Sequence, residues 1–262
     1  MLVFAGFLPN SPLLFPSINT ARMDELTDTV SAVKELSEDL YAVKPDTIVI
    51  LAASQTLYPD AFSLNVADPY TADLSDVGDL GYQKKYHPDF GLIDALQRHA
   101  RQSGAPVTLS TDEKLHSATA IPLHFLTEHL PQIRIVPITP SGLDGKMHFT
   151  FGAVLKHVIL ESSERIAVIG TGDMSHALKE DAPGGFHEDA EKFEEKMLGI
   201  IKERSSAGLI QLDPELVKNA QDTSYREFAM LFGVLDGIDA TPSILSYEKP
   251  FGVGYAVVNF LL

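Results

Sequence analysis

Polar side chains that can exchange protons or bind a metal ion follow several apolar runs of this sequence. The segment GTGDMSHAL, residues 170–178, follows the run RIAVI and holds a carboxylate, Asp173, a hydroxyl, Ser175, and an imidazole, His176. Because an imidazole titrates near neutral pH, His176 can act as a general acid or base. It can equally be a buried histidine whose hydrogen bonds only stabilise the fold. The residues alone leave both roles open.

Groups of the same kinds stand at other predicted strand ends and at one helix start. Ligands in α/β proteins usually bind where strands end, so we expect these side chains to line a pocket. They are Asn10 and Ser11 in LPNSP, Ser54 and Gln55 in AASQT, His116 and Ser117 in KLHSAT, and Asp222, Tyr225 and Arg226 in AQDTSYRE.

The common motifs for nucleotide, zinc and hydrolase sites do not occur in the sequence. GTGDMS is not a dinucleotide-binding fingerprint, because Ser175 stands where the third glycine belongs, and no Walker lysine pattern is found. There is no HExxH, and His124 and His129 are five residues apart, a poor spacing for two ligands on one helical face. We expect both histidines on the surface of a helix over 118–130. The sequence also lacks the GxSxG elbow that is typical of serine hydrolases.

Strand patterns alternate with helical patterns along the whole chain. This alternation predicts one α/β domain over residues 1–262, with a sheet covered by helices on both faces. The polar, turn-rich stretch 68–88 is expected to be an irregular surface excursion near a pocket mouth. The predicted strands are 2–8, 47–53, 62–67, 106–110, 133–138, 165–170 and 254–261, and the predicted helices are 22–43, 89–102, 118–130, 148–161, 187–204 and 224–236.

Composition excludes several classes of partner. The chain has 36 acidic and 20 basic residues, and a net charge of −16 repels nucleic acid. The sequence has no window of about eighteen uninterrupted apolar residues, which a membrane span would need. The absence of cysteine removes disulfides and thiolate metal sites, and the amino terminus lacks the basic region of a signal peptide, so we expect a cytoplasmic protein.

An ordered series of segments resembles the class III extradiol ring-cleavage dioxygenases, catalytic β-subunit type. The resemblance implies an α/β protein with a central mixed sheet and one non-haem Fe(II) at the strand ends. Active members of that family are oxidoreductases of aromatic compound metabolism that open a catecholic or aminophenolic ring with O₂. The series runs from about residue 3 to residue 260 and comprises GFLPNSPLLFP, PDTIVILAASQTLYPDAFSLNV, PLHFLTEHLPQIRIVPI, SGLD, RIAVIGTGDMSHAL, GGFHEDAEKFEEKM, REFAMLFGVLDG and LSYEKPFGVGYAV.

The positions that match the family's metal ligands hold other residues here. The first histidine, in a PHSPLL-like segment, is matched by Asn10, and the second, in an SPHG-like segment, by Ser54 with Gln55 beside it. The glutamate of an AGECG-like segment is matched by the shorter Asp222. An amide, a hydroxyl and one carboxylate bind Fe(II) poorly. They carry only one negative charge, which is too little for tight binding of Mg²⁺ or Ca²⁺. We therefore expect a degenerate metal site and no bound cofactor, with Fe(II) only if the site still functions.

Two further segments match residues of the family that do not bind the metal directly. An SGDLSH-like segment is nearly intact, and the resemblance places His176 at the proton-handling histidine, with Asp173 close by. In the family, a DHG-like segment supplies a histidine that lies next to the metal ligands without binding the metal. Counting back from Pro122 puts Ser117 at that position, and a shift of one residue puts His116 there.

Two hypotheses from different classes follow. The first is a dioxygenase-like protein that is impaired or non-catalytic and binds a small phenolic ligand, either as a homodimer or with a histidine-complete paralogous subunit. The alternative is an active, divergent dioxygenase in which His176 and His116 are catalytic and Asp222 supports an unusual metal site. A third hypothesis, hydrolysis by Ser54 or Ser117 with a histidine, is disfavoured because neighbours such as His116 and Ser117 on a strand point to opposite faces.

Overall fold

The centre of the sheet consists of parallel strands that are buried on both faces. The structure is a computed structural model that describes residues 1–15, 18–19 and 22–262. Every residue of β2 and β9 is buried, which explains their unbroken apolar sequences TIVIL and IAVIGT. Strand β9 pairs in parallel with β1 and β2, and β2 pairs in parallel with β8. These strands are β1 (Leu2–Leu8), β2 (Thr47–Leu51), β8 (Arg134–Thr139) and β9 (Ile166–Thr171).

The flanking strands make the sheet mixed, as the family resemblance implies. The strand order is β10-β11-β1-β9-β2-β8-β5-β4-β7. Strand β3 lies off this path and pairs with both β8 and β6. Strand β11 runs antiparallel to β1, and β10 forms one edge of the sheet. The flanking strands are β3 (Phe62–Asn65), β4 (Tyr70–Asp73), β5 (Gln83–Pro88), β6 (Val107–Ser110), β7 (Lys114–Leu115), β10 (Thr241–Glu248) and β11 (Tyr255–Leu261).

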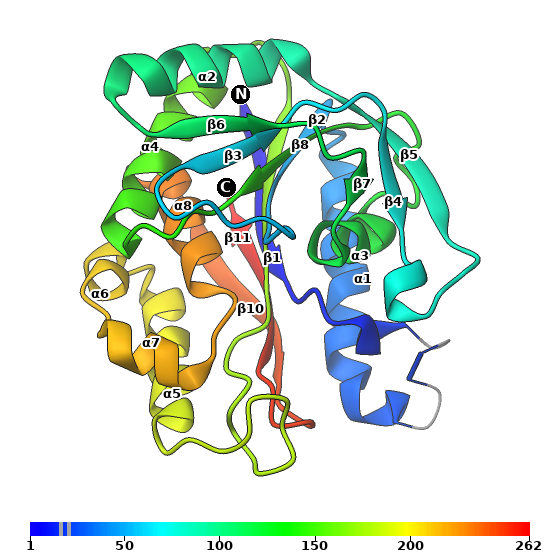
Figure 1. Cartoon of the computed structure of the whole chain (residues 1–262), viewed down its shortest axis with the longest axis vertical. Coiled ribbons are helices and arrows are strands. Elements are labelled where there is room, and N and C mark those ends of the chain that lie inside the picture. The colour runs from blue at the N-terminus through cyan, green and yellow to red at the C-terminus, as the bar shows by residue number, and fades with distance from the viewer. Residues whose placement is uncertain (16–17, 20–21) are drawn as a thin grey trace.

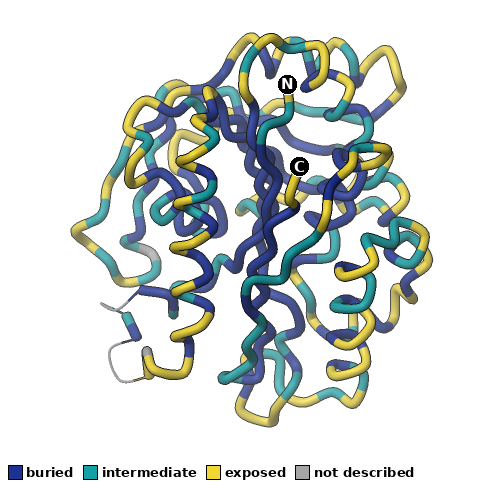
Figure 2. The backbone as a smooth tube through the Cα atoms, turned by 180° about the vertical axis from the view of Figure 1, so that it is seen from behind, coloured by how far each residue is buried: buried dark blue, intermediate teal, exposed yellow. Residues whose placement is uncertain are grey.

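Helices cover both faces of this sheet, which confirms the predicted fold class. Helices α2, α4, α5, α6, α7 and α8 lie on one side, and α1 and α3 on the other (Figure 1). The buried tube of the central strands runs between these two layers, whose outer surfaces are exposed (Figure 2). No helix in the described part of the chain is long and apolar enough to cross a membrane. The helices are α1 (Thr27–Ala42), α2 (Phe90–Ser103), α3 (Ser117–Leu126), α4 (Gly145–Glu161), α5 (Asp189–Glu203), α6 (Ser206–Ile210), α7 (Pro214–Ala220) and α8 (Tyr225–Leu235), with 3₁₀ turns η1 (Pro12–Leu14), η2 (Met23–Leu26) and η3 (Ser75–Val77).

Two local predictions are wrong. The stretch 68–88 contains β4 and β5, which pair antiparallel and extend the sheet beyond β8. Its buried residues include Tyr70, Ala72 and Tyr86. The sequence looks polar because tyrosine carries a hydroxyl group and because charged residues stand beside these positions. His124 is half-buried, with its ring against those of Phe15, Tyr82 and Phe125, instead of lying on the surface. His129 is exposed but lies beyond the end of α3.

Helix α8, which follows Asp222, is fixed by an unusually close contact with α4. A Cβ added at Gly152 in α4 would collide with the backbone of Met230, and one added at Gly233 in α8 would collide with the backbone of Phe149. The two glycines face each other, so the helix backbones approach at a distance that no larger residue permits. This contact sets how closely the second half of α8 packs against α4.

Substitution of Gly233 tests that contact. We expect Gly233→Ala to lower the free energy of unfolding by about 1–3 kcal/mol, because the added methyl group must push two backbones apart. Gly199→Ala is the matched control in α5, where a Cβ meets no atom within 4 Å. It should raise the stability by about 0.5–1 kcal/mol through helix propensity. Urea unfolding of both variants measures this, and equal effects of the two substitutions would contradict the close-packing account.

Candidate functional site

The loop that follows β9, residues 172–178, is held on two sides by backbone hydrogen bonds. Thr223 N donates to Asp173 O at 3.1 Å, and His176 N donates to Ala220 O at 2.9 Å, which joins the loop to the segment before α8. On the other side, Met174 N donates to Gly254 O at 2.8 Å. Gly172 begins the loop where a Cβ would collide with the backbone of Thr223 and Ser224. The loop therefore presents its polar side chains in a fixed arrangement.

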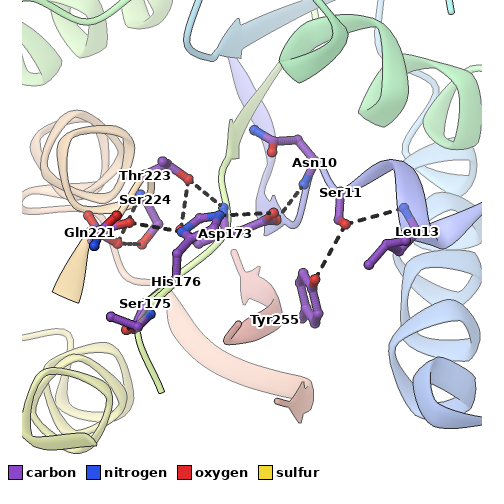
Figure 3. A network of polar contacts seen from close by, with 12 residues as sticks. Asn10, Ser11, Leu13, Asp173, Ser175, His176, Gln221, Thr223, Ser224 and Tyr255 are labelled. Atoms are coloured by element: carbon purple, nitrogen blue, oxygen red, sulfur yellow. Dashed lines mark hydrogen bonds and ion pairs between the residues drawn. The ribbon is translucent and has the colours of Figure 1, made fainter. Parts of the chain in front are cut away.

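Asp173 is the buried acid of this arrangement, with 6% of its surface exposed. Its Oδ1 accepts a hydrogen bond from the backbone N–H of Asn10 at 3.1 Å, which connects the loop to the end of β1 (Figure 3). Burial raises the pKa of Asp173 to about 7, and the nearby charge of Asp222 raises it further. At neutral pH this carboxyl group therefore exchanges readily between its acid and carboxylate forms.

His176 lies beside Asp173 in this loop. Its Nδ1 donates a hydrogen bond to the backbone oxygen of Gln221 at 2.9 Å, and its Nε2 lies 3.8 Å from Asp173 Oδ2 (Figure 3). Burial lowers the pKa of His176 below its usual 6.5, so the imidazole is neutral at pH 7 and Nε2 is a proton acceptor. The pair can take up or release a proton, and the Gln221 contact also gives His176 a structural role.

Asp222 uses both carboxylate oxygens to cap α8. Oδ1 accepts hydrogen bonds from Ser224 N at 3.0 Å and Ser224 Oγ at 2.6 Å, and Oδ2 accepts one from Tyr225 N at 2.7 Å. Burial raises the pKa of Asp222 to about 6, against the effect of these hydrogen bonds. The carboxylate thus satisfies backbone donors at the start of a helix, where a negative charge is stabilised.

The other two positions that match metal ligands offer no strong donor for iron. Asn10 follows β1 and supplies an amide side chain, and the Ser54 hydroxyl donates to Thr56 O at 3.0 Å. Among the described residues, no group of three histidine, cysteine, aspartate or glutamate side chains is placed to hold a metal ion. Fe(II) in proteins prefers imidazole and carboxylate ligands with open positions. The side chains at these three positions therefore do not fit that ion.

The predicted site residues separate into two cavities and one buried network. Ser54 and Asp222 line a cavity of about 670 Å³, together with the start of α8. Ser54 also lines a cavity of about 350 Å³, together with Gln55 and His116. The network consists of Asn10, Asp173 and His176, none of which lines either cavity.

The residues from the DHG-like segment lie at the start of α3. The Nδ1 of His116 accepts a hydrogen bond from Ala118 N at 3.2 Å and so caps that helix. Ser117 is the first residue of α3 and lines neither cavity. The alignment with Ser117 or with His116 at the family's histidine position stays open, and His116 is the one that reaches a cavity.

Sequence reasoning missed two buried titratable residues that support the site. Glu194 in α5 accepts hydrogen bonds from Ser175 N at 2.6 Å and from the Tyr247 hydroxyl at 2.7 Å, and burial raises its pKa to about 7. His148 in α4 accepts from Ser141 N at 3.2 Å, and burial lowers its pKa to about 4. Both stand on the apolar face of their helices, and a polar residue at such a position is the signal that could have found them.

Comparison with known proteins agrees with this fold. The model of the catalytic LigB subunit of aromatic ring-opening dioxygenases matches residues 5–258. The Clostridium acetobutylicum protein CA_C1420 is 26% identical over 261 residues, which cover 96% of this chain and 56% of that relative's length. The crystal structure of the uncharacterized protein JW3007 from Escherichia coli K12 has the same fold, with a TM-score of 0.65, 16% identity and 98% of each chain covered.

Fold, site position and family match together define the class. The polar groups at the ends of β1, β2 and β9 belong to an α/β protein of the ring-opening dioxygenase type. The chain belongs to the family of the catalytic LigB subunit of aromatic ring-opening dioxygenases. It spans about half the length of the curated relative that it matches.

The raised pKa of Asp173 predicts a pH-dependent effect of Asp173→Asn. The folded protein keeps the proton up to about pH 7 and the unfolded chain only up to about 3.8, so the wild type loses stability as the pH rises between these values. Asparagine keeps an oxygen for the Asn10 N–H and has no proton to lose. From about pH 5 to pH 8, we expect the free energy of unfolding of the variant to rise by about 2 kcal/mol relative to wild type. A difference that stays constant with pH in urea unfolding would contradict the assignment.

The lowered pKa of His148 predicts the opposite trend. The unfolded chain binds a proton below about pH 6.5 and the folded protein only near 4, so the contribution of His148 is lost as the pH falls. His148→Asn should destabilise the protein at about pH 7.5, because Ser141 N and Asp144 O lose their partner. That deficit should shrink by about 2 kcal/mol at about pH 4.5. Thermal unfolding at both pH values measures the change, and an undiminished deficit would show that the imidazole is not buried in its neutral form.

Proposed function

We propose that this chain is a member of the ring-opening dioxygenase family that does not cleave rings with Fe(II) and whose scaffold serves to bind a small phenolic ligand or a partner subunit. The observation that carries the proposal is the use of Asp222, whose two oxygens accept hydrogen bonds from Ser224 and Tyr225. Binding a metal ion through this carboxylate would compete with the cap of α8 for the same two oxygens. The other two positions, Asn10 and Ser54, offer no imidazole in compensation.

A second function is supported by the proton-exchanging pair. His176 has a neutral imidazole 3.8 Å from a carboxyl group, Asp173, whose pKa lies near 7. Such a pair suits general acid and base catalysis on a phenolic hydroxyl group. Under this alternative the chain is an active, divergent oxidoreductase that opens a catecholic or aminophenolic ring with an unusual metal site, and His116 contributes from the smaller cavity.

The proposal includes the molecular context of this function. We infer that the chain acts in the cytoplasm, as a homodimer or beside a histidine-complete paralogous subunit that carries the metal. The family match and the replaced ligand positions support this inference. Co-purification of the chain with such a subunit, from cells that express both, would support the assembly. A chain that remains monomeric and separate from it would contradict that part of the proposal.

Oxygen consumption distinguishes the two functions. We expect purified protein supplied anaerobically with Fe(II), and then mixed with catechol or 2-aminophenol in air-saturated buffer, to consume O₂ no faster than the protein-free control. Uptake well above that control would contradict the proposed function. If His176→Ala then abolished the uptake while the far-ultraviolet circular dichroism was unchanged, the alternative would be supported with His176 in its catalytic role.

A further inference from the structure

Two histidines of neighbouring helices stack against each other at the surface of one helical layer. His99 stands in α2 and His157 in α4, and these helices pack together on the same face of the sheet (Figure 1). Their ring centroids are 4.2 Å apart, with an angle of 25° between the ring planes. The side chain of His157 is 52% exposed and His99 is half-buried, so an ion from solution can reach this pair.

A carboxylate lies beside the two histidines. Glu161 follows His157 by one helical turn in α4, and its Oε1 is 3.1 Å from His157 Nε2. Side chains four residues apart on a helix lie on the same face, so both can contact one ion. A tetrahedral zinc ion, with bonds of about 2.0–2.1 Å, separates two such ligand atoms by about 3.3–3.4 Å. The observed separation therefore needs to widen by only a few tenths of an ångström to admit the ion.

The imidazole of His99 is available as a second nitrogen ligand. Its ring nitrogens make no hydrogen bond and no ion pair with any residue that the structure describes. In the described part of the chain, His99, His157 and Glu161 do not yet converge on a common point, so the stacked rings have to tilt apart to face one ion. Side chains at the surface change rotamer within picoseconds to nanoseconds. The change therefore involves side chains only and leaves both helices in place.

The surroundings of these three side chains favour a cation. Glu161 is the last residue of α4, where the carbonyl groups of the final turn give the helix end a partial negative charge. The basic residues that precede the two histidines in sequence already have acidic partners. Arg98 pairs with Asp94 at 2.7 Å, and Lys156 pairs with Asp236 at 3.4 Å. Their charges are thus compensated and do not oppose a bound metal ion.

We propose that His99, His157 and Glu161 bind one divalent zinc-type ion that links α2 to α4. Two imidazoles and one carboxylate form a ligand set that suits Zn²⁺, with water completing the coordination. Fe(II) binds more weakly than Zn²⁺ to such ligands. Helix α4 begins at Gly145 in the wall of the larger cavity, and His157 lies about 18 Å further along its axis. The inference therefore goes beyond the proposed function and does not depend on it.

Calorimetric titration of the metal-free protein with zinc chloride tests the inference. We expect the wild type to bind one ion at this site with micromolar or tighter affinity. His99→Gln and His157→Gln each remove an imidazole ligand and should each weaken that binding by at least about tenfold. Glu161→Gln replaces the carboxylate by a neutral amide and should weaken it by at least about threefold. The matched control is His129→Gln, which removes an exposed histidine whose ring contacts Tyr41, and it should change the affinity by less than about twofold.

Thermal unfolding separates a link between the two helices from ion binding elsewhere. An ion held by the folded helices stabilises the native state, so Zn²⁺ at about a hundredfold excess over its dissociation constant should raise the Tm of the wild type by about 5 °C. The double variant with His99→Gln and His157→Gln should show less than about a fifth of that rise, and its Tm in EDTA should match the wild type if the fold is intact. No zinc binding by the wild type, undiminished binding or an undiminished rise in the double variant, or an equal loss in His129→Gln would overturn the inference.

Discussion

The pairing of the loop after β9 with the segment before α8 is the constraint on which the site depends. Backbone hydrogen bonds join Asp173 to Thr223 and His176 to Ala220, and the Thr223 hydroxyl donates to Asp173 O at 2.9 Å. The loop thereby connects the ends of β1 and β9 to the first turn of α8. The Gly152 and Gly233 contact fixes the same helix from its other side. The two contacts thus restrain α8 at the segment before its first turn and in its second half.

This constraint explains how the fold persists where the family's metal ligands are replaced. Asp222 stabilises the chain as a helix cap, and Asp173 does so by holding Asn10, so both acids contribute to the structure without any ion. Burial raises the pKa of both carboxyl groups and lowers that of His176. Perturbed titration of this kind occurs at functional sites and in structural networks alike.

The sequence was sufficient for the architecture but not for the division of the site. Period-two and helical patterns predicted the central strands and the larger helices to within a few residues, because burial on one or both faces dictates those patterns. They missed β4 and β5, whose buried tyrosines read as polar, and also the strands β7 and β10 and the short helices α6 and α7. Ser54 and His116, singled out at predicted strand ends, and Asp222, singled out at a predicted helix start, line cavities. That His116 and Asp222 line different cavities, and that Asp222 caps a helix, depends on tertiary geometry that no local pattern encodes.

An anaerobic calorimetric titration of the purified protein with Fe(II) tests the central claim most directly. If the carboxylate of Asp222 serves α8 and no imidazole replaces the lost ligands, the titration should show no stoichiometric binding at micromolar affinity. Stoichiometric binding at that affinity or tighter, weakened by Asp222→Asn, would contradict the account. It would mean that the Asp222 carboxylate helps to hold a metal ion.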